Sequence, residues 1–169
     1  MNFVNPKKRF GQNFLTNDKI AEDIVSFLSD SKTKTILEIG PGKGILTKNL
    51  IKKSNKKKKF IEIDSDCIEY LKIKFDGIDD DLINKDFLKI DLNSFDKPIS
   101  IIGNFPYNIS SQILFKIYEN KNIINEMVGM FQLEVAERIC SNFGTKKYGI
   151  LSVLIQAFFE VKMMKKIKP

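Results

Sequence analysis

The chain contains no histidine and no tryptophan, and its two cysteines, Cys67 and Cys140, do not form a C-x-x-C pair. The missing histidine excludes a histidine general base, and the isolated cysteines argue against a zinc site. We therefore expect an activity that needs no metal ion. The two cysteines are expected to be small core residues in a reducing compartment.

Long hydrophobic segments are also missing. The longest apolar stretch, Ile150–Phe159, is interrupted by Ser152 and Gln156 and is much shorter than a membrane span. The first ten residues are polar and lack the apolar centre of a secretory signal. We expect a cytoplasmic protein that makes no contact with a membrane.

The composition fits one folded domain, which we expect to cover residues 1–169. Of the 169 residues, 43% are hydrophobic and 29% are charged, so the chain can bury a core and is not typical of a disordered protein. The formal net charge of +7 favours a polyanionic partner. A genome-wide bias toward lysine would give the same charge, so the charge alone does not identify that partner.

Strand and helix patterns alternate along the chain. The first helix is expected at Asp18–Leu28, with Asn17 as its N-cap. Regular alternation implies right-handed crossovers and a doubly wound, mainly parallel α/β sheet. We expect strands at Thr35–Ile39, Lys59–Ile63, Asp81–Asn84, Ile99–Ile102, Glu126–Gln132 and Phe158–Met163, and late helices at Val135–Cys140 and Tyr148–Ala157.

A glycine-rich turn follows the first expected strand. Gly40, Gly42 and Gly44 let the backbone bend sharply and approach a ligand that a Cβ atom would exclude. Such a turn alone also fits a dinucleotide site or a plain connection. Glu62 comes about twenty residues later, where an acid commonly accepts hydrogen bonds from ribose hydroxyls. Because the turn lacks a P-loop sequence and is shorter than a dinucleotide fingerprint, an adenosine cofactor without pyrophosphate fits best.

Asp86 lies beyond the third expected strand, at the same edge of the sheet. Its carboxylate can accept a hydrogen bond from the adenine amine of such a cofactor, while Phe87 packs on the ring. Taken alone, an aspartate in this position is better explained as a turn or cap residue. The neighbouring glycine turn and Glu62 are what favour a binding role.

Asn104, Phe105, Pro106 and Tyr107 form an N-x-P-Y tetrapeptide directly after an apolar strand. Open α/β sheets bind ligands at this end of a strand. The Asn104 amide and a backbone carbonyl, of Phe105 or of Pro106, can accept hydrogen bonds from an exocyclic amine, and the Tyr107 ring can stack on a flat base. Asn-x-Pro is also an ordinary turn signal. In the context of the preceding sites, the tetrapeptide indicates methylation of adenine.

Seven segments, in this order and at this spacing, resemble the ribosomal RNA adenine dimethyltransferases. The resemblance runs through nearly the whole chain and is highly specific. It rests on Lys8–Leu15 (KRFGQNFL), Glu38–Gly44 (EIGPGKG), Phe60–Asp64 (FIEID), Asp86, Asn104–Ser110 (NFPYNIS), Gln132–Ile139 (QLEVAERI) and Tyr148–Gln156 (YGILSVLIQ).

The resemblance implies a Rossmann-like class I methyltransferase fold with S-adenosyl-L-methionine as cofactor. It implies dimethylation of adjacent adenines near the 3′ end of small-subunit ribosomal RNA, in ribosome biogenesis, by a protein that we expect to be a monomer. The small-subunit precursor would be its partner. By the same resemblance the catalytic residues are Asn104, Pro106 and Tyr107, and the cofactor contacts are Asn13, Leu15, Gly40, Glu62, Asp86 and Asn104.

The chain departs from the family pattern in three places. Asn13 stands where histidine is usual, as in the macrolide-resistance branch, and Phe105 stands where leucine is commoner. The family normally continues after a segment like Lys165–Pro169 with a last antiparallel strand, which lies between the fifth and sixth strands, and a small helical domain. We expect both to be missing here, which leaves sheet edges unpaired.

Two other functions remain open. The chain fits an RNA-binding module for ribosome assembly or transcription, in which methylation is secondary or lost. It also fits a methyltransferase of the macrolide-resistance type, which acts on large-subunit RNA.

Overall fold

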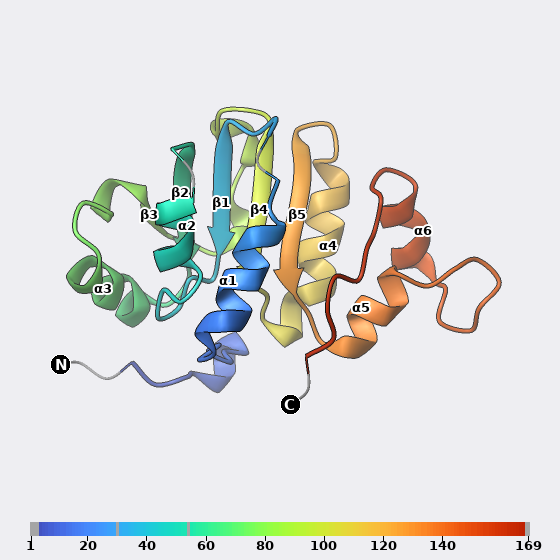
Figure 1. Ribbon diagram of the computed structural model, residues 1–169, viewed down its shortest axis with the longest axis horizontal. Coiled ribbons are helices and arrows are strands. Elements are labelled where there is room, and N and C mark those ends of the chain that lie inside the picture. Colours follow the sequence, from blue (N-terminus) through green and yellow to red (C-terminus); the bar gives the residue numbers. More distant parts are fainter. Residues whose placement is uncertain (1–3, 30, 54, 168–169) are drawn as a thin grey trace.

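The computed structural model describes residues 4–29, 31–53 and 55–167 (Figure 1). Its centre is a five-stranded sheet with the order β3-β2-β1-β4-β5, in which every neighbouring pair is parallel. The mainly parallel α/β sheet expected from the sequence is thus confirmed. The strands are β1 (Thr35–Ile39), β2 (Lys57–Glu62), β3 (Leu82–Asn84), β4 (Ile99–Asn104) and β5 (Ile124–Met130).

The described part of the chain contains six α-helices and several short 3-10 turns. The helices are α1 (Asp18–Phe27), α2 (Thr47–Lys53), α3 (Ser65–Lys74), α4 (Ser110–Glu119), α5 (Leu133–Ile139) and α6 (Ile150–Gln156). Of these, α2, α3 and α4 lie between strands, α1 precedes the first strand, and α5 and α6 follow the last. The 3-10 turns that matter for the site are η1 (Lys8–Phe10), η3 (Phe87–Lys89) and η5 (Tyr107–Ile109).

Helices cover both faces of the sheet. Successive side chains of a strand point to opposite faces, so Ile36 packs in one cluster with α1 and α2, while Leu37 packs in another with α4. All five residues of β1 are buried, as expected for a strand with helices on both sides. A third, smaller cluster joins α4, α5 and α6.

The strand order creates a switch point between β1 and β4. The chain builds β2 and β3 outward on one side of β1, and then places β4 on the other side. The carboxyl ends of β1 and β4 therefore border a crevice, where open sheets of this kind bind ligands. In Figure 1 this is the lower edge, along which the N-terminal segment runs.

Two local expectations are confirmed at the residue level. The first strand has the predicted bounds, Thr35–Ile39. Asn17 is the N-cap of α1, and its side chain accepts a hydrogen bond from the backbone N–H of Ile20 at 3.1 Å.

The second strand begins earlier than predicted. The sequence suggested Lys59–Ile63, but β2 starts at Lys57, which pairs in register with Thr35 of β1. A lysine run is typical of a solvated loop, yet backbone pairing with a central strand overrides that tendency. The lysine side chains still reach polar partners, since Lys59 Nζ lies 2.8 Å from Asp81 Oδ1.

The predicted sixth strand at residues 158–163 is wrong. This segment pairs with none of the described strands and runs past α5 without regular secondary structure (Figure 1). Its alternating apolar side chains pack instead on the α4–α6 cluster, through Phe159 and Val161. A strand needs a neighbour for its backbone groups, and the family strand expected between the fifth and sixth is not among the described residues.

Candidate active site

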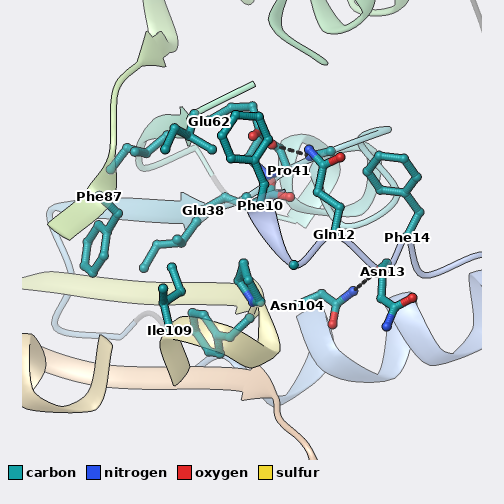
Figure 2. A pocket seen from close by; sticks show the side chains of 18 of the residues that line it. Phe10, Gln12, Asn13, Phe14, Glu38, Pro41, Glu62, Phe87, Asn104 and Ile109 are labelled. Carbon is teal, nitrogen blue, oxygen red and sulfur yellow. Dashed lines mark hydrogen bonds between the residues drawn. The ribbon is translucent and has the colours of Figure 1, made fainter. Parts of the chain in front are cut away.

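A cavity of about 210 Å³ opens at the carboxyl ends of β1, β2 and β4 (Figure 2). All six residues that the resemblance assigns to the cofactor line it, together with Pro106. They come from five separate parts of the fold: the N-terminal segment, the turn after β1, the end of β2, the turn after β3 and the end of β4 with the loop that follows. The six are Asn13, Leu15, Gly40, Glu62, Asp86 and Asn104.

The glycine turn forms the floor of this cavity. Gly40 and Gly42 adopt left-handed backbone conformations, with φ of 65° and 55°, which non-glycine residues rarely adopt. A Cβ atom on Gly42 would lie 2.9 Å from Cε1 of Phe14, a ring that also lines the cavity. The turn therefore needs glycine both for its conformation and for the approach of Phe14.

Glu62 ends β2 and is almost fully buried. Its Oε2 accepts the backbone N–H of Gly42 at 3.0 Å, and its Oε1 accepts that of Asp64 at 3.0 Å. Burial raises the pKa of Glu62, although these backbone hydrogen bonds oppose the shift. Each carboxylate oxygen can accept a further hydrogen bond, as a ribose hydroxyl would require.

Glu38, on the buried strand β1, also lines the cavity. Its Oε2 accepts the Thr47 hydroxyl at 2.9 Å, but its buried Oε1 has no hydrogen-bond partner among the residues that the structure describes. Burial, with a smaller contribution from Glu62, raises the pKa of Glu38 to about 8. An unsatisfied buried acceptor is costly, so Glu38 is a candidate ligand-binding group. Sequence reasoning noted Glu38 before the glycine turn but gave it no role.

Asp86 is both a cap residue and part of the cavity lining, the two positions that the sequence left open. It is the N-cap of η3, and its Oδ1 accepts the backbone N–H of Leu88 at 2.9 Å. It also lines the cavity, beside the buried ring of Phe87. Among the described residues its second oxygen has no hydrogen-bond partner. That oxygen is available to accept an amine hydrogen.

The N-terminal segment crosses the mouth of the cavity and is anchored to the turn after β2. We call residues 7–15 the strap. Lys7 Nζ lies 2.6 Å from Asp64 Oδ1 and 2.7 Å from Asp66 Oδ2, while Gln12 Nε2 donates to Asp64 Oδ2 at 3.0 Å. Burial alone would raise the pKa of Asp64, but the hydrogen bonds from Lys7 and Gln12 hold it below its usual range.

The strap is anchored on its other side by the tetrapeptide. The side-chain amide of Asn104 donates to the backbone carbonyl of Asn13 at 2.8 Å, a bond drawn in Figure 2. A carbonyl can only accept, so the NH2 group of Asn104 faces the strap and its Oδ1 faces away from Asn13. Among the described residues, Oδ1 has no hydrogen-bond partner.

The tetrapeptide backbone is held by α4 and by the core. The Pro106 carbonyl already accepts the Ser110 hydroxyl at 2.9 Å and the Ile109 N–H at 3.3 Å. The Phe105 ring is 1% exposed and lies 4.8 Å from the Phe131 ring. It occupies the space beside Gly129 of β5, where an added Cβ atom would collide with it. The loop is thus fixed at both of its central residues.

Tyr107 lies in a groove next to the cavity and does not line the cavity itself. Its side chain is 42% exposed. The groove runs along β5 and shares Asn13 and Phe14 with the cavity, so the groove and the cavity meet at the strap. The Tyr107 ring is therefore available to a second, flat ligand that approaches from the groove.

Two absences hold for the described residues. Histidine, cysteine, aspartate and glutamate form no group of three or more in these ranges that could hold a metal ion. Across the same part of the chain, no helix has the length and apolarity that crossing a membrane requires.

The parallel sheet, the glycine turn after β1, the acid that ends β2 and the polar loop after β4 define a Rossmann-like fold of the class I methyltransferase type. The chain belongs to the ribosomal RNA adenine dimethylase family, whose model matches residues 4–169. The family resemblance seen in the sequence is thus confirmed.

A curated relative shows how far the similarity extends. Ribosomal RNA small subunit methyltransferase A of Cytophaga hutchinsonii is 49% identical over 166 residues, which cover 97% of this chain and 64% of that protein. The chain therefore spans less than two thirds of that relative's length.

Two solved structures share the fold. A dimethyladenosine transferase from Plasmodium falciparum matches with a TM-score of 0.71 and 31% identity, over 85% of this chain and 52% of that chain. The 23S rRNA methyltransferase ErmE matches with a TM-score of 0.63 and 28% identity, over 75% of this chain and 50% of that chain.

Proposed function

We propose that the chain is the methyl-transfer domain of an S-adenosyl-L-methionine-dependent enzyme that dimethylates adjacent adenines near the 3′ end of small-subunit ribosomal RNA. The family and the names of its relatives support this substrate. The observation that carries the proposal is the oriented amide of Asn104. Its NH2 group is held by Asn13, and its Oδ1, which has no partner within the described ranges, lies beside a cavity with the acceptors that an adenosine cofactor needs.

The cavity residues fit this cofactor. Gly40 leaves the turn open to close approach, since a Cβ atom there would meet nothing within 4 Å. Glu62 can accept hydrogen bonds from ribose hydroxyls and Asp86 from the adenine amine, while the unpartnered Oε1 of Glu38 can accept one from the amino-acid end. When bound, the cofactor supplies an electrophilic methyl group on a sulfonium.

The tetrapeptide would prepare the target amine for attack. The lone pair of an adenine amine is delocalised into the ring, so the amine is a poor nucleophile until its hydrogens are held out of plane. Asn104 Oδ1 accepts one of these hydrogens. The Pro106 carbonyl is already engaged by Ser110 and Ile109, which favours the Phe105 carbonyl as the second acceptor. Most of the rate gain would then come from proximity and orientation.

Tyr107 would hold the target base. Enzymes that modify a base take it out of the stack and bind it against aromatic side chains. The exposed Tyr107 ring lines the groove that adjoins the cavity, so a base stacked on it would enter from the groove toward Asn104. Pro106 contributes by fixing the backbone between these two side chains.

The test compares two variants with the parent. Asn104→Ala is expected to abolish methyl transfer to small-subunit particles, because it removes the acceptor for the amine. Binding of S-adenosyl-L-methionine, measured by isothermal titration, is expected to persist more strongly in Asn104→Ala than in Glu62→Ala. Equal methyl transfer by Asn104→Ala and the parent would refute the catalytic role of Asn104.

The similarity to ErmE supports a second candidate, a methyltransferase of large-subunit RNA. Mapping the methylated adenine on small- and large-subunit RNA distinguishes the two. Cofactor binding without transfer to either RNA would instead favour the RNA-binding module for assembly.

A further inference from the structure

Lys116 of α4 lies behind the turn that carries Asp86. We call residues 86–90 the η3 loop. Lys116 Nζ donates to the carbonyl of Leu88 at 2.9 Å and to that of Ile90 at 2.6 Å, and it lies 5.5 Å from the centre of the Phe87 ring. Lys116 does not line the cavity, so it can influence a ligand only through this loop.

The η3 loop needs an outside partner. Three of its N–H groups are satisfied locally: Leu88 donates to Asp86 Oδ1, Lys89 to the Asp86 carbonyl at 3.0 Å and Ile90 to the Phe87 carbonyl at 3.2 Å. Among the described residues, Lys116 is the only partner recorded for the carbonyls of Leu88 and Ile90. A single 3-10 turn is weakly stable on its own. The buried Phe87 ring packs in one cluster with residues of α4, and Lys116 adds the polar contacts that fix the loop carbonyls.

We propose that Lys116 is a positioning residue for adenine recognition, because it fixes the η3 loop so that the free oxygen of Asp86 meets the exocyclic amine of the cofactor. This inference rests on the proposed function. The lysine touches neither cofactor nor substrate and acts entirely through the loop.

The surroundings of Lys116 support this role. Burial lowers the pKa of Lys116, and the acidic groups Glu119, Asp86 and Asp91 oppose the shift by favouring the charged form. A charged donor gives stronger hydrogen bonds than a neutral one. The same helix begins at Ser110, which holds the Pro106 carbonyl. Helix α4 therefore sets the positions of the η3 loop and the tetrapeptide relative to each other.

The experiment measures how well the protein distinguishes an amine from a carbonyl on the purine. Binding of S-adenosylhomocysteine and S-inosylhomocysteine is measured by isothermal titration. The parent is expected to prefer the adenosyl compound by about tenfold, since the inosyl carbonyl would face the Asp86 carboxylate. Lys116→Met is expected to lose most of this preference, while Lys116→Arg, which can still donate to two carbonyls, keeps it.

A matched control lies just beyond the same helix. Lys121 follows α4, and its Nζ lies 4.7 Å from the centres of the Tyr118 and Phe158 rings, away from the η3 loop. Lys121→Met removes a similar lysine–ring contact and is expected to bind both compounds as the parent does. Lys116→Gln keeps a side-chain NH2 group that can donate to a carbonyl. Its preference for the adenosyl compound is expected to lie between those of the parent and Lys116→Met. It replaces Lys116→Met if that variant does not fold.

The possible outcomes distinguish a failure of this inference from a failure of the proposed function. If the variants weaken both compounds equally and keep the parent's preference, Lys116 only supports the fold and the inference is overturned. If the parent binds both compounds alike, the pairing of Asp86 with the amine is wrong, and this inference falls with it. If the parent binds neither, the proposed cofactor itself is refuted.

Discussion

The Asn104 amide and the Asn13 carbonyl are joined by a 2.8 Å hydrogen bond across 91 positions of sequence. Asn104 is the last residue of strand β4, and Asn13 lies in the strap. The bond therefore links the position of the strap to the orientation of the amide that we propose to be catalytic.

Asn104→Asp separates the two functions of this amide. The carboxylate can still accept an amine hydrogen, but it cannot donate to the Asn13 carbonyl and repels it instead. We expect faster hydrogen exchange in the strap and a fall of about tenfold in single-turnover methyl transfer, much less than in Asn104→Ala. Unchanged strap exchange in Asn104→Asp would show that the bond to Asn13 does not hold the strap.

Lys7→Met tests the other anchor of the strap. The change removes both ion pairs to Asp64 and Asp66 and leaves the Gln12 hydrogen bond in place. We expect severalfold weaker cofactor binding by isothermal titration, and a smaller salt dependence of binding than in the parent, because salt screens exposed charges. Lys48→Met, which breaks the 2.6 Å surface pair with Asp18, is the control and is expected to bind like the parent.

Glu38→Gln tests the buried acid on β1 through the pH dependence of stability. Below its usual pKa of 4.5, Glu38 is protonated in the folded and unfolded chain. As the pH rises toward the folded pKa of about 8, only the unfolded chain ionises, so the free energy of unfolding falls by about 1.4 kcal/mol per pH unit. Because glutamine does not ionise, the free energy of unfolding of Glu38→Gln does not fall in this way.

Urea unfolding of parent and Glu38→Gln, without cofactor, checks this. From about pH 5 to about pH 7, the free energy of unfolding of Glu38→Gln should rise relative to that of the parent by on the order of 3 kcal/mol. A smaller decline in the same direction should remain in both proteins, since the pKa of Glu62 is also raised. If the free energies of unfolding of the parent and Glu38→Gln changed equally with pH, Glu38 would be ionised in the folded protein.

Gly42→Ala tests the floor of the cavity, with Gly77→Ala as its matched control. Both glycines have left-handed φ angles, 55° and 73°, so each alanine should cost about 1 kcal/mol in unfolding free energy. Only the Cβ atom at position 42 meets the Phe14 ring. We therefore expect weaker cofactor binding in Gly42→Ala alone, and equal losses of binding in both variants would contradict the role of Phe14.

The sequence predicted the parts of the fold that depend on local patterns. The bounds of β1 and the cap at Asn17 follow from an apolar run and from capping chemistry, and both are confirmed. The predicted strand at residues 158–163 failed because alternation describes a half-buried segment but cannot supply a pairing partner. The early start of β2 was missed because pairing with β1 outweighs the polarity of its lysines.

The six residues that the motifs assign to the cofactor line one cavity and Tyr107 lines the neighbouring groove. The contacts that orient these residues could not be read from the sequence. Lys7 binds Asp64 over 57 positions, and Lys116 binds the Leu88 carbonyl over 28. Such pairs arise only when the topology brings distant segments together. Asp64 caps α3, a role that capping chemistry can explain locally, but its partnership with the strap had no local signal.

The Phe105 ring fills the volume that a methyl group on Gly129 would require, so the sizes of these two side chains depend on each other. Leucine at position 105 would leave a void that alanine at 129 could partly fill, whereas alanine at 129 beside phenylalanine would displace the loop that holds Asn104. Grafting this tetrapeptide into another scaffold of the same architecture thus requires transferring a glycine from the adjacent strand as well.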